Sequence, residues 1–305
     1  MILKKIKRVF ANILSSIALI ACSLIIRHIS RKNLYLFAEK LGTVGYWLLA
    51  RHRRVAFEGL SHAFGKTKSP AEIKKIARDC FIYMAKSSSE LAFVIGRPGF
   101  IRSSSTIEGQ EHLDQALAKG KGVILVSGHF GNFVLMLAKL SIDGYKTSVI
   151  MRPLKNRQIE GLFETDRAKL DINTISSIPR TACVANTIKA LRENRLLLIP
   201  LDQNFGTSGV YVDFFGRKAA TATGPVVLAQ RTGAAILPCF IIRQKDDTHR
   251  IVFEPALDLL KGKDEAETIV NNIQRITKII ESYIRRYPQE WSWIHRRWKS
   301  RPKEN

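Results

Sequence analysis

The stretch from Val126 to Met136, VSGHFGNFVLM, places a histidine where one sequence pattern gives way to another. His129 follows a short apolar run and precedes an apolar run with helical spacing. An imidazole in such a turn can take a proton from a hydroxyl, and it does so best when a carboxylate orients it. A lone histidine is also commonly a structural residue. The stretch therefore makes His129 a candidate general base whose acidic partner has to be found.

Two further polar residues close apolar runs elsewhere in the chain. Arg152 ends the run KTSVIMR, and Asp202 ends the run RLLLIPLD. Because ligands bind at the rim formed by the carboxyl ends of parallel strands, we expect His129, Arg152 and Asp202 to share that rim. Each has a plainer explanation alone, namely a structural histidine, a surface ion pair, and a helix cap or turn residue. Their occurrence at three strand ends favours a functional site.

Glycines flank the histidine in SGHFGN. Gly128 and Gly131 allow a sharp turn and bring backbone amides close to a substrate. A helix that begins near Asn132 would offer free N–H groups to a developing oxyanion, and Asn132 is itself a candidate substrate contact. The absence of GxxxxGK[ST], GxGxxG, GxSxG and HExxH motifs disfavours nucleotide-binding, serine hydrolase and zinc peptidase sites. We expect no metal and no cofactor.

The order of apolar runs predicts the fold that positions these residues. Strand-like runs occupy 122–127, 146–152, 195–202, 234–242 and 249–255, and helix-like segments separate most of them. Such alternation indicates an α/β fold with a mostly parallel sheet flanked by helices. Residues 34–100 look helical, with a helix entry at Ser69 and Pro70; these helices could rest on a membrane or pack on the core. We expect one domain over 33–305, with a helical part at 33–115 and an α/β catalytic part at 116–305.

The charge balance indicates the kind of partner. The 305 residues include 49 Lys and Arg but only 26 Asp and Glu, a net charge of +23. Nucleic acid, anionic lipid or an acidic protein would suit such a surface, but no nucleic-acid-binding motif is present, so we expect no nucleic acid. The four cysteines are far apart and form no CxxC pair, which predicts reduced thiols.

The N-terminus predicts a membrane anchor over residues 1–32. The basic stretch KKIKR is followed by seventeen uncharged residues, FANILSSIALIACSLII at 10–26. This length is at the lower limit for crossing a hydrocarbon core of about 30 Å. A signal peptide is an alternative, although no clear cleavage site follows, and a buried core helix is another. Basic residues on both sides leave the orientation open.

Longer motifs resemble one family over nearly the whole chain. The chain is similar to the bacterial lipid A late acyltransferases, the lauroyl and myristoyl transferases, within the wider glycerolipid acyltransferase group. The resemblance is carried by RHRRVAFEGLSHAF (51–64), SGHFGN, MRPLKN (151–156), LDQNFGTSGVYVDFFGRKAATATGP (201–225) and YPQEWSWIHRRWKSRP (287–302). The second-last and last of these are the most specific.

The resemblance implies a reaction, a location and a set of partners. A fatty acyl group would pass from acyl carrier protein to a hydroxyl of a lipid A precursor or related glycolipid. The reaction would take place at the cytoplasmic face of the bacterial inner membrane. Acyl carrier protein is acidic and lipid A precursors carry phosphates, which suits a basic chain. His129 matches the histidine of the family's H-x4-[D/E] motif, the base that prepares the hydroxyl to attack the thioester. Acyl chain length and acceptor hydroxyl are left open.

The chain departs from this motif at its acidic position, which is Val134. A valine can neither orient an imidazole nor stabilise its charged form. Another carboxylate could reach His129 from the same rim, with Asp202 as first candidate and Glu164 as second. Alternatively, positioning and an oxyanion hole could carry the rate, because a thioester is already activated. The third reading is a catalytically inactive relative that binds lipid or carrier protein.

The resemblance also suggests residues that contact the substrates. Arg152 could hold a phosphate or the oxyanion. Phe214 and Phe215 are candidates for a wall of the acyl-chain site, and Arg217 and Lys218 for headgroup contacts; the alternative is a β-hairpin whose aromatic residues belong to the core. The C-terminal WSWIHRRWK mixes indoles with cations, which suits a membrane interface or an anionic headgroup, and a solvated basic tail is the alternative.

Overall fold

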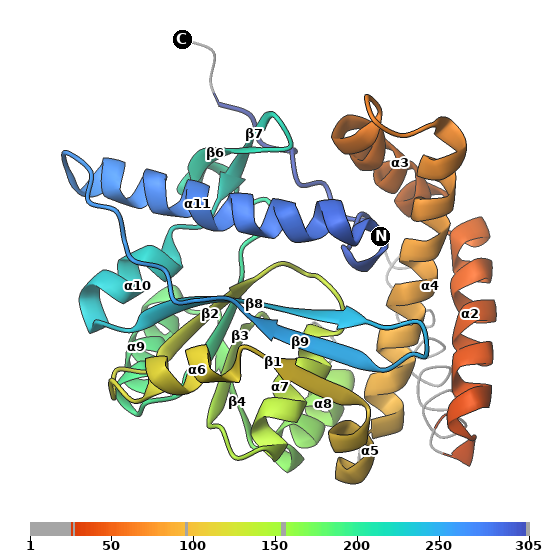
Figure 1. Ribbon diagram of the computed structural model, residues 1–305, viewed down its shortest axis with the longest axis horizontal. Coiled ribbons are helices and arrows are strands. Elements are labelled where there is room, and N and C mark those ends of the chain that lie inside the picture. Colours follow the sequence, from red (N-terminus) through yellow and green to blue (C-terminus); the bar gives the residue numbers. More distant parts are fainter. Residues whose placement is uncertain (1–25, 27, 95–96, 154–156, 303–305) are drawn as a thin grey trace, which may run out of the picture.

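The computed structural model describes residue 26 and residues 28–94, 97–153 and 157–302, and a seven-stranded sheet lies at its centre (Figure 1). Five neighbouring strands, β8, β2, β5, β3 and β4, run parallel, while β9 and β1 run the opposite way at one edge. The predicted α/β class with a mostly parallel sheet is confirmed. In sheet order the strands are β1 (Ser105–Glu108), β9 (His249–Phe253), β8 (Ala235–Arg243), β2 (Val123–Ser127), β5 (Leu196–Pro200), β3 (Thr147–Met151) and β4 (Ile172–Ser176).

Five of these strands lie within the apolar runs expected from the sequence or end one residue beyond them. The two outermost strands, β1 and β4, were not expected. Their sequences, STIE and INTIS, mix polar and apolar residues, and both strands are only partly buried. An edge strand lacks the continuous apolar pattern of a central parallel strand, which explains the omission. Because β1 pairs with β9, the segment 33–115 is not purely helical.

The central strands divide their side chains between two hydrophobic cores on the two faces of the sheet. In β2, Ile124 and Val126 point into one core while Val123 and Leu125 point into the other, as the two-residue period of a strand requires. The first core is closed by α9 (Arg180–Arg192), α10 (Gly224–Thr232) and α11 (Glu265–Arg286). The second is closed by α5 (Pro98–Ser103), α6 (Gln110–Leu117) and α7 (Phe133–Ile142). Helix α8 (Arg157–Lys169) follows β3 and packs beside β4.

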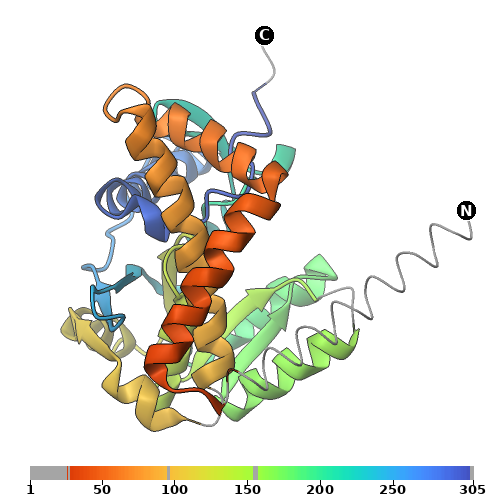
Figure 2. The ribbon, with the colours of Figure 1, turned by 90° about the vertical axis from the view of Figure 1, so that its right-hand side faces the viewer.

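Three helices precede the sheet and stand at one side of it, namely α2 (Arg31–Leu48), α3 (Ala50–Phe64) and α4 (Pro70–Val94) (Figures 1 and 2). The predicted helix entry is confirmed: the Ser69 N–H donates to Glu72 Oε2 at 2.8 Å, and the Glu72 N–H donates to Ser69 Oγ at 3.3 Å. This reciprocal pair is a capping box. Residues of α3 and α4, such as Leu60 and Phe81, share a core with the strands, whereas α2 lies on the outer side of α4 (Figure 2).

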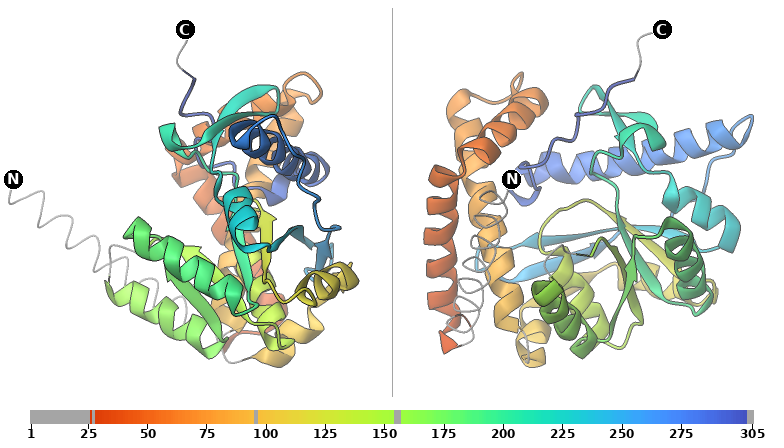
Figure 3. Two further views of the ribbon diagram at one scale, coloured as in Figure 1. Left: turned by 90° about the vertical axis from the view of Figure 1, so that its left-hand side faces the viewer. Right: turned by 180° about the vertical axis from the view of Figure 1, so that it is seen from behind.

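A short hairpin, β6 (Val210–Phe214) and β7 (Arg217–Thr221), packs against α11 on the side away from the sheet (Figures 1 and 3). Its two turn residues, Phe215 and Gly216, both have positive φ angles, +54° and +76°. This is the backbone that two-residue hairpin turns adopt to match strand twist. Two single turns of 3-10 helix, Gly206–Ser208 and Pro288–Glu290, complete the elements of the described residues.

The predicted membrane anchor at 1–32 lies almost wholly outside the described residues. Over the part of the chain that is described, no helix has both the length and the apolar character needed to cross a bilayer.

Candidate active site

The structure brings His129 and Asp202 together at the rim of the sheet. The strands β2 and β5 are neighbours in register, with Ser127 opposite Pro200, and each of the two residues lies two positions beyond its strand. Nδ1 of His129 is 2.7 Å from Oδ1 of Asp202. Because an ionised carboxylate only accepts hydrogen bonds, Nδ1 carries the proton and Nε2 has an unprotonated lone pair.

That lone pair faces outward. The side chain of His129 is 29% exposed, and the exposed Gln203 amide donates to its Nε2 at 3.1 Å. The protonated nitrogen is thus directed into the protein and the basic nitrogen toward the surface. This is the tautomer that a general base requires.

The carboxylate of Asp202 is buried and held on its other oxygen by two donors. The backbone N–H of His129 donates to Oδ2 at 2.7 Å, and the Trp291 indole N–H donates to it at 2.6 Å. Gly128 makes this approach possible, because a Cβ there would lie 3.3 Å from the carboxylate. The orientation of the carboxylate, and with it that of the imidazole, is therefore fixed by the fold.

Electrostatics strengthens the base. Burial lowers the pKa of His129, but the adjacent Asp202 carboxylate raises it by charge and hydrogen bonding, and the net pKa lies above the ordinary 6.5. Burial alone would raise the pKa of Asp202. The charge of His129 and the hydrogen bonds that His129 donates to the carboxylate outweigh burial and lower the pKa of Asp202 below its usual range. Asp202 therefore stays ionised, and His129 accepts a proton more readily than a free imidazole.

The two other positions considered from the sequence, Val134 at the acidic position of the motif and Glu164 as a substitute acid, do not supply the carboxylate at His129. Val134 sits in the first turn of α7 and is partly exposed, and Glu164 is exposed on α8. The carboxylate that contacts the imidazole is that of Asp202.

The turn that carries His129 is clamped to the C-terminal segment. The Gly131 N–H donates to the Glu290 carbonyl at 2.9 Å, and the Ser292 N–H donates to the His129 carbonyl at 3.1 Å. Gly131 has φ +56°, and a Cβ there would lie 2.1 Å from the Ile241 carbonyl oxygen, so only glycine fits. The amides of His129 and Gly131 therefore both donate within the protein.

Asn132 is the N-cap of α7, so the helix begins where the sequence predicted. Its Oδ1 accepts from the Leu135 N–H at 3.2 Å. Its Nδ2 donates to Glu90 Oε2 at 2.9 Å and to the Ser87 carbonyl at 3.2 Å. The residue is buried and both ends of its amide are engaged. The structure therefore places Asn132, predicted as a substrate contact, inside the protein, where its amide has three partners.

The predicted cationic contacts lie at the surface. Arg152 is exposed one residue beyond β3, which neighbours β5, so it ends at the same rim as His129 and Asp202. Arg217 and Lys218 lie in β7, partly exposed and exposed respectively.

Phe214 and Phe215 are buried in the core. The Phe214 ring lies 5.6 Å from that of Trp291, and the Phe215 ring lies 5.5 Å from that of Phe64. The structure thus places both residues, predicted as a wall of the acyl-chain site, among the core side chains of the hairpin.

Sequence reasoning missed the residues that enclose Asp202. Trp291 and Trp293 are buried in the protein. The composition of this segment had indicated a membrane interface or an anionic headgroup, with a solvated basic tail as the alternative. Nε2 of His295 donates to the Asp202 carbonyl at 3.0 Å, and Arg297 donates to the Gln203 carbonyl at 3.2 Å. The unusual density of tryptophan in WSWIHRRWK was the available signal, but a mixture of indoles and cations does not reveal which side chains are buried.

Comparisons of the sequence with family models and curated proteins find bacterial acyltransferases. The family model described as "Bacterial lipid A biosynthesis acyltransferase" matches residues 4–300. The chain is 26% identical over 278 residues to the lipid A biosynthesis palmitoleoyltransferase of Escherichia coli (strain K12), covering 86% of this chain and 84% of that one. It is 29% identical over 203 residues to the lipid A biosynthesis lauroyltransferase of the same organism, covering 64% and 61%.

Two further matches are to acyltransferases whose names give other acceptors. The chain is 30% identical over 195 residues to a phosphatidylinositol mannoside acyltransferase of Mycobacterium tuberculosis (strain CDC 1551 / Oshkosh), covering 63% of this chain and 59% of that one. Among solved structures, the 1-acyl-sn-glycerophosphate acyltransferase of Thermotoga maritima matches with a TM-score of 0.39 and 14% identity, covering 85% and 99%.

Proposed function

Because the chain belongs to the family of bacterial lipid A biosynthesis acyltransferases, we propose that it transfers a fatty acyl group from acyl carrier protein to a hydroxyl of a lipid A precursor or related glycolipid. The observation that carries the proposal is the 2.7 Å contact between His129 Nδ1 and Asp202 Oδ1, with the opposite nitrogen facing outward. The names of the relatives, which act on lipid A or on a phosphatidylinositol mannoside, support a glycolipid acceptor.

The proposed reaction needs one proton acceptor and no cofactor. The acceptor hydroxyl takes the place of the Gln203 amide at His129 Nε2 and gives its proton to that nitrogen. Its oxygen attacks the carbonyl carbon of the thioester. The carbon–sulfur bond then breaks, an ester forms, and the leaving thiolate takes the proton back from Nε2. Asp202 remains ionised throughout and stabilises the imidazolium between the two proton transfers.

The developing oxyanion needs a donor of its own. The backbone amides of His129 and Gly131 are engaged, so we assign this role to the start of α7 and to Arg152. The positive end of a helix dipole and an exposed guanidinium at the same rim both suit a negative oxygen. Arg217 and Lys218 remain our candidates for the anionic headgroup.

The alternative is that the chain is catalytically inactive and only binds lipid or carrier protein. Val134 favours this alternative, because it occupies the position of the motif's acid. The buried, doubly held carboxylate of Asp202 favours activity, because a chain that no longer catalyses has no need to direct a basic nitrogen outward. A mass spectrum of the total lipids of a deletion strain separates the two. We expect the loss of one defined acyl chain, restored by the wild-type gene and not by His129→Ala. Restoration by that variant would favour the binding role.

We expect a specific pH dependence. A base must be neutral to act, and the pKa of His129 is raised above 6.5. The value of kcat/KM for the purified chain should therefore rise with pH through an apparent pKa above 6.5 and then level off. Initial rates measured between pH 5 and pH 9 with acyl carrier protein thioester test this. A plateau already complete at pH 6 would contradict it.

We also propose that the catalytic domain rests on the cytoplasmic face of the bacterial inner membrane. Support comes from α2, which presents an apolar face to solvent, with Trp47 62% and Leu48 75% exposed. The exposed apolar side chains in and just after this helix are Leu36, Leu41, Val44, Trp47, Leu48 and Leu49. Exposed cations follow directly at Arg51 and Arg54. An apolar stripe with a tryptophan and adjacent cations suits the surface of an anionic bilayer.

Fluorescence quenching tests this placement. In vesicles that contain brominated anionic lipid, the full chain should lose tryptophan fluorescence, because Trp47 enters the acyl region. Trp291 and Trp293 are buried in the protein, and the partly exposed Trp298 is held on the β6–β7 hairpin by its hydrogen bond to the Phe214 carbonyl. The variant Trp47→Phe should lose most of that quenching. Equal quenching in the two proteins would show that this face of α2 does not contact lipid.

A further inference from the structure

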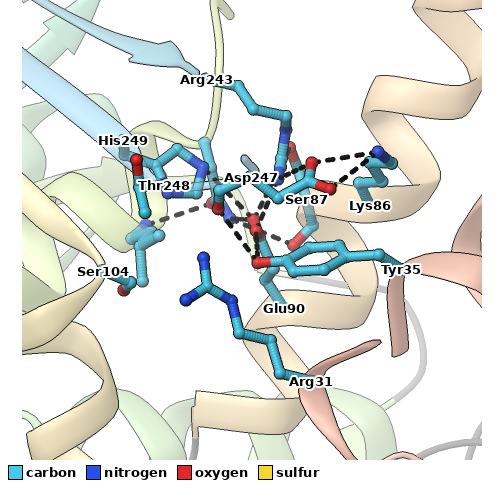
Figure 4. Close-up of polar contacts among 12 residues, drawn as sticks. Arg31, Tyr35, Lys86, Ser87, Glu90, Ser104, Arg243, Asp247, Thr248 and His249 are labelled. Atoms are coloured by element: carbon cyan, nitrogen blue, oxygen red, sulfur yellow. Dashed lines mark hydrogen bonds and ion pairs between the residues drawn. The ribbon is translucent and has the colours of Figure 1, made fainter. Parts of the chain in front are cut away.

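A buried ionic cluster lies between α4 and the hairpin of β8 and β9 (Figure 4). At its centre the fully buried carboxylate of Glu90 faces the guanidinium of Arg243, whose side chain is 2% exposed. Nη1 donates to Oε1 at 2.6 Å and Nη2 donates to Oε2 at 2.7 Å. The Tyr35 hydroxyl donates to Oε1 at 2.7 Å. We call Tyr35, Glu90, Asn132 and Arg243 the Glu90 cluster.

Stability alone does not explain this arrangement. Removing two charges from water costs several kcal/mol for each ion, and apolar residues of the same volume often stabilise a protein as well or better. What a bidentate ion pair does provide is fixed geometry.

The fourth member of the cluster points to the turn of His129. Asn132 Nδ2 donates to Glu90 Oε2 at 2.9 Å, while Asn132 Oδ1 caps α7 by accepting from the Leu135 N–H. Asn132 is three residues after His129. The carboxylate of Glu90, together with the Ser87 carbonyl, therefore holds the NH2 group of this amide inward and leaves its oxygen in place to cap α7.

Arg243 reaches the same turn by a second route. Its backbone N–H donates to Glu290 Oε1 at 2.8 Å, and the carbonyl of Glu290 accepts from the Gly131 N–H at 2.9 Å. The turn is thus held through Asn132 on one side and through Gly131 on the other, and both paths lead to the Glu90–Arg243 pair.

We propose that Glu90, paired with Arg243, is a positioning residue of the acyl transfer reaction: through Asn132 it fixes the turn that sets His129 against Asp202. The inference rests on the proposed function and deepens it. A displacement of about 1 Å at a catalytic group can cost on the order of 10²-fold in rate, so loss of this link should lower kcat without changing which substrates bind.

The competing explanation is purely structural. Lys86 of α4 pairs with Asp247 at 3.0 Å, and Asp247 also contacts Arg243 at 3.2 Å. Tyr35 of α2 donates to the Asp247 carbonyl at 3.2 Å, so these contacts join α2 and α4 to the turn between β8 and β9. A cluster with that role alone would change the melting temperature when altered, and would leave kcat and its pH profile as they are.

The test uses three variants of the full chain. Glu90→Gln removes the charge that Arg243 and Asn132 share. Asn132→Ser keeps an oxygen that can cap α7 but loses the contacts of Nδ2 with Glu90 Oε2 and with the Ser87 carbonyl, and it breaks the link if Glu90→Gln does not fold. Tyr35→Phe is the matched control, because it removes a hydrogen bond to Oε1, the oxygen that does not contact Asn132.

We expect Asn132→Ser and Glu90→Gln to lower kcat at least about tenfold with KM within about twofold. Their kcat/KM profiles should shift to lower pH, because a displaced His129 is less strongly coupled to Asp202. Tyr35→Phe should lower the melting temperature and keep kcat within about twofold. Unchanged kcat and pH profile in a folded Asn132→Ser would overturn the positioning role. If the wild type itself transferred no acyl group, the proposed function would fail instead.

Discussion

Replacing His129 with alanine is expected to lower kcat for acyl transfer by about 10²–10⁴-fold, the usual contribution of a general base. The variant should still fold. The ring is partly exposed, and the buried Asp202 carboxylate keeps two donors, the backbone N–H at position 129 and the Trp291 indole. Initial rates with acyl carrier protein thioester and a lipid A precursor, together with a melting curve, measure both effects.

Val134→Ala is the matched control for this change. Val134 occupies the position where the family motif has its acid, yet Asp202 is the carboxylate that contacts His129. We expect the control to keep kcat within about twofold, because it removes no partner of the imidazole. Near-normal transfer by His129→Ala would contradict the assignment of the base and favour catalysis by positioning alone.

Asp202→Asn is expected to lower kcat by roughly 10²–10⁴-fold, the upper end being the cost of the corresponding change in a serine protease. The reason is the tautomer. Two N–H donors face the position of Oδ2, so the amide oxygen of asparagine must take that position. Its NH2 group then faces His129 Nδ1, which has to accept. The proton moves to Nε2, and the outward nitrogen is no longer basic.

The same rate measurement checks this variant, with Glu193→Gln as the control, because Glu193 is an exposed carboxylate at the C-cap of α9. Because asparagine is nearly isosteric with aspartate, we expect the fold to persist and the loss to appear in kcat. A variant that folds and transfers at nearly the wild-type rate would show that Asp202 does not replace the missing acid of the motif.

Much of this site followed from the sequence because parallel strands end at one rim. His129 and Asp202 are 73 positions apart, yet each follows a continuous apolar run, and the neighbouring position of β2 and β5 brings them within 2.7 Å. Arg152 was placed at the rim by the same rule. A strand-end residue can be located in this way without knowing the packing of the helices.

What could not be predicted depends on side chains that meet from distant segments. Asn132 looked like a substrate contact, but its amide is directed inward by Glu90, a residue in a helix 42 positions earlier. Phe214 and Trp291 looked like membrane or acyl-chain contacts, since composition does not distinguish a buried aromatic residue from an exposed one. The strands β1 and β4 were missed because edge strands lack the continuous apolar pattern.

In this account Asp202 takes the place of the acid absent at position 134, because it orients the His129 imidazole and raises the pKa of that ring. Nitrogen-15 NMR of the His129 imidazole, titrated in the wild type and in Asp202→Asn, tests it most directly. We predict that the neutral wild-type ring carries its proton on Nδ1 and that its pKa lies above 6.5, whereas the variant ring is protonated on Nε2 with a lower pKa. The same tautomer and the same pKa in both proteins would contradict the claim.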